Sequence, residues 1–500
     1  ASLPVVGNLL TTVTASYNHS AVPTLKDALS VNRSLGNGSA VTGVPIALNL
    51  LGLGSNTFQD RGAGIVKLTV GVTGVSNTLL NSLVNLSGSV VTRVVPKSLR
   101  LVPALNGTDL SASNNKVPAG GNFQLKVQGQ DIDGNTIPID ADLASLGTIS
   151  LTKALVKPAT AYIKANPDLV VGVISTASGV PTVDVSWAEA GTVSLSSNGV
   201  SNYMGSGLDV AAGGLGGFNL RFVPASFKVD VTPPCTDGSN AFAYAGQPAS
   251  VSISALNAQG ALTQNYDGSA PAAADRVAND VTVSAVSGLT SGAMSGSLVS
   301  ATAFDTGVGT GTVTDTYAAA KKLSAPERVG LNATDADVTS NSSTPTLLVR
   351  SGRIKLSNAY GSEQSTISMP IQVQYWDGRT WVPSADAACT PLSTLKGAVV
   401  RSVFKSHKGV VLNQVALPVS LKDLALDKGV GTISLNPPGK GVTGTVDVTL
   451  DLSASGANMP WFQSLDASCG ANTVCNPTAR ASFGVFAPET QKTVNTRNVY

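Results

Sequence analysis

The chain has 500 residues, of which 42% are hydrophobic and only 12% are charged, and its formal net charge is +2. This balance excludes the strongly basic character that binding to nucleic acid or to an anionic membrane surface requires. The length suits about three to four domains. The 51 glycines, together with many Val, Thr and Ser residues, are typical of short strands joined by turns. No apolar run reaches the roughly 20 residues that span a bilayer.

The chain opens with a mostly apolar segment, Ala1–Leu10, which lacks the basic start of a signal peptide. Alternation then continues through Val13, Ala15 and Tyr17. We expect this segment to be the first strand of an ordinary sandwich. The alternative is an exchanged strand that completes the sheet of a neighbouring subunit.

Three later stretches repeat one pattern, and they begin at Arg93, Arg221 and Leu348. Their equivalent residues Pro96, Pro224 and Arg350 lie 128 and 126 residues apart. A solenoid unit repeats every 20–50 residues or so, which is much shorter. The repeat therefore has the size of a whole domain.

Each repeat continues with an alternating strand that runs into a tight turn. The strands are Phe123–Val127, Val251–Ala255 and Ile371–Tyr375, and the turns end at Gly134, Gly260 and Gly378. Alternation of apolar and polar residues predicts strands with one buried face.

Helical periodicity is nearly absent. The best candidates are residues 154–166 and 78–84, and Pro158 limits the first to a short helix at most. We predict an all-β fold of tandem immunoglobulin-like sandwiches that form an elongated rod. The predicted domains are residues 1–92, 93–220, 221–346 and 347–500.

Four cysteines offer two disulfides. Cys469 and Cys475 enclose a short polar loop, which favours a bridge between them, and Cys235 with Cys389 would form the remaining pair. The alternative for the second pair is two buried thiols. Disulfides would place the protein outside the cytoplasm, and we expect the bacterial cell surface.

Few residues suggest ligand or metal chemistry. Asp131, Asp133 and Asn135 place oxygens at alternate positions, as calcium loops do, but a hairpin turn explains the same residues. Trp381 could stack against a sugar, although pairing of aromatic residues across a hairpin is ordinary. The two histidines, His19 and His407, lack the partners that nucleophilic catalysis needs. We therefore predict no catalytic residues, no cofactor and no enzyme activity.

Several sequence segments in the second half of the chain resemble those of a known family. They are Phe242–Pro248, Thr263–Gly268, Arg353–Glu363, Gln374–Gly378 and Ala479–Phe486. They are similar to the C-terminal region of MshQ-type proteins, which belong with the mannose-sensitive haemagglutinin (MSHA) type IV pilus. The resemblance covers roughly 190–500 and implies that Tyr500 is the natural C-terminus. Family members often carry a lectin-like domain upstream, and residues 1–92 show no sign of one.

Together these features predict a non-enzymatic structural or adhesive surface protein associated with a type IV pilus. The alternative is a self-assembling subunit of an extracellular fibre or sheath, and a carbohydrate-active enzyme is a remote third. The expected partners are pilus or fibre subunits of the same or a related protein, and surface glycans.

Overall fold

The computed structural model describes short strand segments between residues 12 and 73 and most of residues 86–484. Within the latter range, the residues not described are 138, 140–150, 176–180, 204–205, 213–214, 216–217, 238–239, 290–291, 296–297, 318–321, 386–397, 413–418, 421–428, 454 and 464–473. By internal packing the chain divides into two units. Unit 1 comprises Ala1–Ala225, Leu256–Tyr266 and Ala270–Val277, and unit 2 comprises Ser226–Ala255, Asp267–Ser269 and Ala278–Tyr500.

The N-terminal strands form a sheet of order β4-β1-β6-β7 and a smaller sheet of order β3-β2-β5. Their bounds are β1 Thr12–His19, β2 Leu29–Ser30, β3 Ser34–Leu35, β4 Ala40–Pro45, β5 Gln59–Asp60, β6 Gly64–Thr73 and β7 Leu86–Val94. The segment Ala1–Leu10, expected to be the first strand of a sandwich or, in the alternative, an exchanged strand, lies outside the described residues, so both readings stay predictions.

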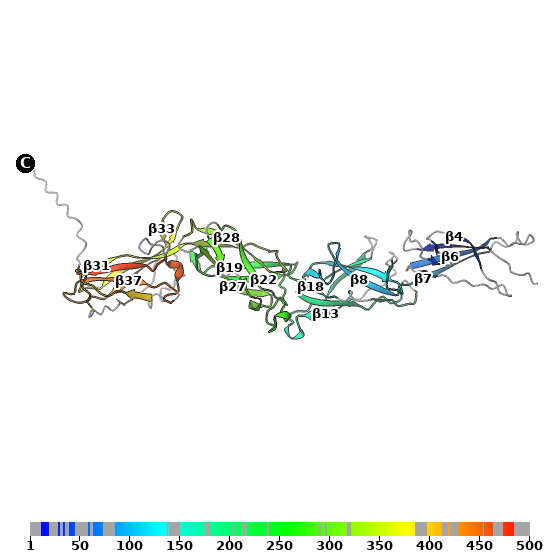
Figure 1. Ribbon diagram of the computed structural model, residues 1–500, viewed down its shortest axis with the longest axis horizontal. Coiled ribbons are helices and arrows are strands. Elements are labelled where there is room, and N and C mark those ends of the chain that lie inside the picture. Colours follow the sequence, from blue (N-terminus) through cyan, green and yellow to red (C-terminus); the bar gives the residue numbers. More distant parts are fainter. Residues whose placement is uncertain are drawn as a thin grey trace, which may run out of the picture. The chain divides into compact units, whose positions relative to one another are not determined.

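The second sandwich packs a sheet of order β10-β18-β16-β13 on a sheet of order β14-β15-β11-β8-β17, with β9 and β12 attached. Figure 1 labels its strands β8, β13 and β18. Its strands are β8 Ser98–Leu105, β9 Thr108–Asp109, β10 Lys116–Pro118, β11 Phe123–Gln130, β12 Thr136–Ile137, β13 Leu151–Lys157, β14 Val170–Ser175, β15 Thr182–Ser186, β16 Gly191–Ser197, β17 Ala211–Ala212 and β18 Leu220–Val223. Inward residues from both sheets, such as Leu125 and Val193, share one core. This arrangement buries one face of each sheet, as the alternation predicts.

The third sandwich has one sheet of order β19-β22-β27-β24 and another of order β20-β21-β29-β28-β23-β25. Its strands are β19 Ser226–Thr232, β20 Cys235–Asp237, β21 Asn240–Tyr244, β22 Ala249–Leu256, β23 Val281–Ser287, β24 Gly292–Ser295, β25 Leu298–Val299, β26 Phe304–Asp305, β27 Val308–Tyr317, β28 Glu327–Thr334 and β29 Thr346–Arg350.

The fourth sandwich has sheets of order β30-β32-β36-β35 and β31-β38-β37-β34. Its strands are β30 Gly352–Leu356, β31 Ala359–Gly361, β32 Ile367–Trp376, β33 Trp381–Pro383, β34 Val399–Arg401, β35 Val419–Ser420, β36 Val430–Leu435, β37 Gly444–Leu450 and β38 Thr478–Phe483. The predicted class of tandem immunoglobulin-like sandwiches is confirmed. The predicted domain boundaries stay predictions.

The first helix candidate, residues 154–166, is wrong for most of its length. Strand β13 occupies this segment to Lys157 because it pairs with β16, and the only helical part is a 3-10 turn at Thr160–Tyr162. The other described 3-10 turns are Ala273–Asp275, Ala301–Ala303 and Pro460–Phe462. The second candidate, residues 78–84, lies outside the described residues. No helix in the described part of the chain has the length and hydropathy to cross a membrane.

Candidate functional site

The three predicted turns are present, and their glycines have positive φ angles: 85° at Gly134, 79° at Gly260 and 104° at Gly378. A residue with a Cβ rarely adopts this conformation, which explains the recurring glycine. The turns differ in what surrounds them: the segments at Gly260 and Gly378 bond to other parts of the chain.

The turn at Gly260 belongs to the loop Leu256–Tyr266, which is part of unit 1. Its backbone and side chains bond to the end of the second sandwich. The Ala258 N–H donates to the Ala119 carbonyl at 2.9 Å, and Gln259 Nε2 donates to the Gly120 carbonyl at 2.9 Å. Gly120 has φ +72°, and a Cβ at this position would collide with Gln259. The positive φ favours glycine at position 120, because other residues rarely adopt this conformation.

Glu189 holds the other end of the same loop. It is only 4% exposed, and its two carboxylate oxygens accept the N–H groups of Gln264 and Asn265, each at 2.8 Å. Burial raises the pKa of Glu189, and the N–H donors of Asn265, Gln264 and Ala190 lower it part of the way. Charge-assisted bonds of this kind are stronger than neutral ones.

Asn265 completes this contact and is fully buried. Its Oδ1 accepts the N–H groups of Lys164 and Ala165 at 2.9 and 3.0 Å, and its Nδ2 donates to the Ala165 carbonyl at 2.6 Å. We call Glu189, Asn265 and the residues bonded to them the loop clamp. Its buried polar groups fix the conformation of the loop on the second sandwich.

Within unit 2, the third and fourth sandwiches share a hydrophobic core around Tyr244. The fully buried Tyr244 ring lies edge-on to Phe462 at 4.7 Å and to Phe242 at 5.2 Å between ring centroids. Its hydroxyl group is 2.8 Å from Ser384 Oγ. A Cβ at Gly352 would collide with Tyr244, so this position also requires glycine. The two sandwiches are therefore packed together rather than merely linked.

The turn at Gly378 lies beside this shared core. Trp376 Nε1 donates to the Ser324 carbonyl at 3.1 Å, and Lys322 Nζ lies 4.2 Å above the Trp376 ring. The guanidinium group of Arg350 lies 4.5 Å from the centre of the Phe242 ring and 4.6 Å from that of Tyr375. Cation–π contacts thus add to the packing in unit 2.

Trp381, the predicted ligand contact, is half-buried in β33. Its ring is edge-on to Trp376 at 5.6 Å, and the Arg353 guanidinium lies 4.3 Å from its centre. Arg353 therefore covers one ring face on which a sugar could stack. The ligand role of Trp381 stays a prediction.

The calcium candidates Asp131, Asp133 and Asn135 form the exposed turn at Gly134. Asp131 Oδ1 accepts the N–H groups of Asp133 and Asn135, both at 2.9 Å, and Asp131 Oδ2 accepts Asn135 Nδ2 at 3.1 Å. These bonds involve both carboxylate oxygens of Asp131, as expected of a turn. Among the described residues, no three His, Cys, Asp or Glu side chains are grouped to hold a metal ion.

Cys235 and Cys475, the two cysteines within the described residues, are disulfide-bonded. Neither is a free thiol. The predicted partners, Cys389 and Cys469, lie outside the described residues, so both pairings stay predictions.

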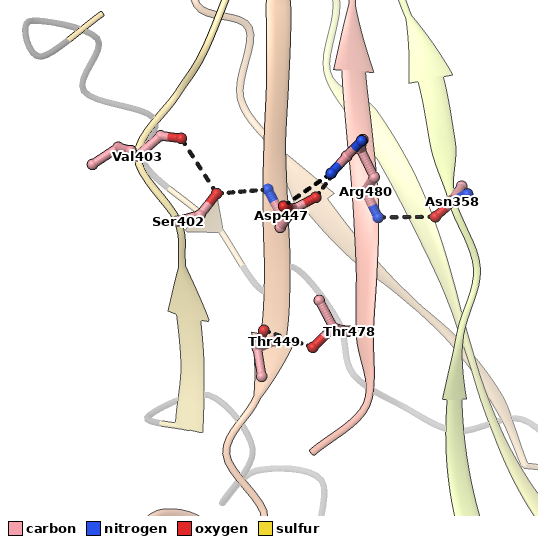
Figure 2. A network of polar contacts seen from close by, with 7 residues as sticks. All are labelled: Asn358, Ser402, Val403, Asp447, Thr449, Thr478 and Arg480. Carbon is pink, nitrogen blue, oxygen red and sulfur yellow. Dashed lines mark hydrogen bonds and ion pairs between the residues drawn. The ribbon is translucent and has the colours of Figure 1, made fainter. Parts of the chain in front are cut away.

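The outer face of the sheet β34-β37-β38-β31 carries a row of polar contacts (Figure 2). Arg480 Nε donates to Asp447 Oδ1 at 2.7 Å, and the second bond of this bidentate pair measures 3.2 Å. The Arg480 N–H also donates to Asn358 Oδ1, and Ser402 Oγ accepts the Asp447 N–H. Arg480 is 58% exposed at its side chain, so water screens the pair and its stabilisation is small.

Two acidic side chains are buried in the third sandwich. Asp315 on β27 is 2% exposed, and Glu327 on β28 of the facing sheet is 4% exposed. Burial raises the pKa of Asp315 to about 6, and the charge of Glu327 adds to the effect. Neither oxygen of Asp315 makes a full hydrogen bond to a described residue, although the Ala293 N–H is close enough to stabilise the anion in part.

No sequence pattern directly indicates the loop clamp or the acidic pair. Glu189 and Asn265 are 76 residues apart, and polar residues near turns are normally solvated. One sequence feature does coincide with these contacts. Three of the segments that resemble the known family contain contact residues: Tyr244 in Phe242–Pro248, Asn265 in Thr263–Gly268 and Trp376 in Gln374–Gly378.

Comparison with known structures finds tandem β-domains. The chain is similar to the Escherichia coli adhesin FdeC, with 14% identity, a TM-score of 0.32 and coverage of 77% of this chain and 96% of that one. It is similar to invasin, a bacterial integrin-binding protein, with 11% identity, a TM-score of 0.26 and coverage of 95% and 72%. The I9–I11 tandem of titin follows with 9% identity, a TM-score of 0.21 and coverage of 73% and 93%. The fold assignment rests on the strand orders above and not on these likenesses.

Comparison with curated proteins gave no match. Two family models do match: residues 189–351 match DUF6701, third domain, and residues 350–499 match DUF6701, fourth domain. Neither description names a pilus. The chain therefore carries the third and fourth domains of the DUF6701 family.

Proposed function

We propose that this protein is a non-enzymatic structural or adhesive component of the bacterial cell exterior, associated with a type IV pilus of the MSHA kind. The observation that carries the proposal is the use of buried polar and aromatic residues. In the loop clamp and around Tyr244, such residues hold β-elements together. A protein that transmits force or presents a distant surface needs stiff contacts of this kind more than it needs a cleft.

The disulfide bonds of Cys235 and Cys475 support a location outside the cytoplasm, because reducing compartments rarely keep such bonds. The low charge is in keeping with a surface or fibre protein. The association with a pilus follows from the sequence resemblance alone.

A second candidate function is a subunit of a homopolymeric extracellular fibre or sheath. One observation favours it. Strand β14 is an edge strand whose valines are exposed, which is the feature that strand-to-strand association uses.

Immunogold electron microscopy on intact cells of the source bacterium would test the proposal. Gold particles along or at the tips of pili are the expected result, and particles on separate filaments would favour the fibre subunit. Labelling confined to permeabilised cells would refute both. The elongated arrangement predicted from the sequence can be tested separately by small-angle X-ray scattering of the purified protein.

A further inference from the structure

One sheet of the second sandwich carries an excess of positive charge. Its strands β10, β18, β16 and β13 contain the cationic residues Lys116, Arg221, Lys153 and Lys157, and they contain no Asp or Glu. The strands of the facing sheet hold two cationic and two acidic residues, so their charges balance. The positive charge of this sandwich is therefore concentrated on one side of it.

Three of these cations lie in one row across the sheet. Lys116 on β10 is paired with Arg221 on β18. Thr192 on β16 is paired with Arg221 on one side and with Lys157 of β13 on the other. Paired residues of neighbouring strands point to the same face, and Phe222, which follows Arg221, is buried in the core. The row of Lys116, Arg221 and Lys157, which we call the cationic row, therefore faces outward.

The cationic row works against the stability of the sheet. Strands lie about 4.8 Å apart, so neighbouring cations in the row are about 5–10 Å from each other and repel. The effect is present at Lys157, whose pKa is lowered by burial and then by the charge of Arg221, while the carboxylate of Asp275 raises it in part. Positions that break a stability rule in this way are typical of functional surfaces.

Hydroxyl groups share the outer face with the cationic row. Thr192 lies within the row, and Ser194 and Ser196 are the next outward positions on β16. Thr152 on β13 is paired with Ser196. The outward residues of these four strands include no aromatic ring, which is the platform on which single-stranded nucleic acid stacks its bases. The face thus combines positive charge with groups that bond to sugar hydroxyls.

We propose that this face binds a linear polysaccharide that carries carboxylate groups. The cations of the row bind successive carboxylates along the polymer, and the planar guanidinium group of Arg221 suits a bidentate contact. The serine and threonine hydroxyls beside the row bond to the hydroxyls of the sugars. A bound polyanion also neutralises the repulsion within the row. The inference deepens the proposed adhesive role and rests on it.

Fluorescence anisotropy of a labelled alginate oligosaccharide, titrated with the full chain, tests this proposal. Wild-type binding is expected at low salt and should weaken at least about tenfold in about 0.5 M NaCl, because salt screens exposed charges. The double variant Lys116→Gln/Lys157→Gln should bind about tenfold more weakly, since it removes two exposed ion pairs with the ligand. Its melting temperature should equal or exceed that of the wild type, because the like-charge repulsion is gone.

The matched control is Lys97→Gln/Arg100→Gln. It removes the same charge from the facing sheet, where both side chains are exposed on or beside β8. This variant should bind alginate as the wild type does. An unlabelled dextran of equal length, which is neutral, should not compete with the labelled alginate.

Four results would overturn the proposal. They are a wild-type protein that does not bind alginate, competition by dextran, equal losses of binding in the two double variants, and equally tight binding of oligothymidylate or polyglutamate of the same charge. The last result would assign the face to another class of polyanion. A failure to bind alginate would leave the proposed role at the cell exterior untouched, since immunogold labelling tests that role independently.

Discussion

Substituting Asp315 by asparagine should stabilise the third sandwich at neutral pH. Asp315 is 2% exposed, and its pKa is raised from 3.8 to about 6 by burial and by the charge of Glu327. A shift of this size corresponds to about 3 kcal/mol, at 1.36 kcal/mol for each pKa unit. This is the free energy that the folded state loses when it must hold the ionised carboxylate.

The direction with pH follows from the raised pKa. Below about pH 4 the carboxyl group is protonated in both the folded and the unfolded state, so it carries no penalty. As the pH rises from about 4 to about 6, the unfolded state ionises while the folded state still holds its proton, so stability falls, and it levels off once both states are ionised. Asp315→Asn keeps the shape and removes the charge. The variant should therefore lose this pH dependence and exceed the wild type by about 2–3 kcal/mol at pH 7.5.

Hydrogen exchange followed by mass spectrometry gives a local measurement, which a chain of several domains needs. Protection factors of amides in β27 and β28 should fall by about tenfold in the wild type between pH 5 and pH 7.5, because about half of the penalty is already present at pH 5, and they should stay level in the variant. Asp305→Asn, at an exposed carboxylate on β26, is the control. A wild type with equal protection at both pH values, or a variant less protected than the wild type at pH 7.5, would refute the reasoning.

Three further variants test the contacts described above. Glu189→Ala leaves two backbone N–H groups without an acceptor and should lower the protection of the Asn265 amide by about 2 kcal/mol. Glu189→Gln keeps one acceptor oxygen and should lower that protection less. Equal losses of protection in the two variants would contradict the role of the charge. Tyr244→Phe removes one buried hydrogen bond and should lower the free energy of unfolding in urea by about 1–2 kcal/mol, with the exposed Tyr360→Phe unchanged. Trp381→Ala should leave binding to a glycan array unaltered because a cation already covers one ring face, and loss of binding would assign a sugar contact to Trp381.

The strands of the repeats could be predicted because alternation and turn residues are local signals. Phe123–Val127 lies in β11, Val251–Ala255 in β22 and Ile371–Tyr375 in β32. Strand β13 could not be predicted because Ala154–Val156 has no turn residue or alternation to mark it. Its pairing with β16 overrides the weak local preference.

The polar contacts could not be predicted in the same way. Asp315 shares a face of β27 with Val313, so alternation indicates that it points inward, but a carboxylate is not expected to be buried there because burying a charge is costly. Likewise, the bonds between Glu189 and Asn265 join residues that only the folded chain brings together. Single-sequence patterns report the face of a strand, but they do not report which distant polar group meets another.

Unit 1 is built from three separate segments of the chain, which limits how this protein can be divided into fragments. The polypeptide passes from one unit to the other at Ala225, Ala255, Tyr266, Ser269 and Val277. A fragment cut after Ala225 would lack Leu256–Tyr266 and so expose the carboxylate of Glu189 and the backbone around Gly120 to water. Recombination that transfers the second sandwich without the loop Leu256–Tyr266 would break the same contacts, so these two parts must be transferred together.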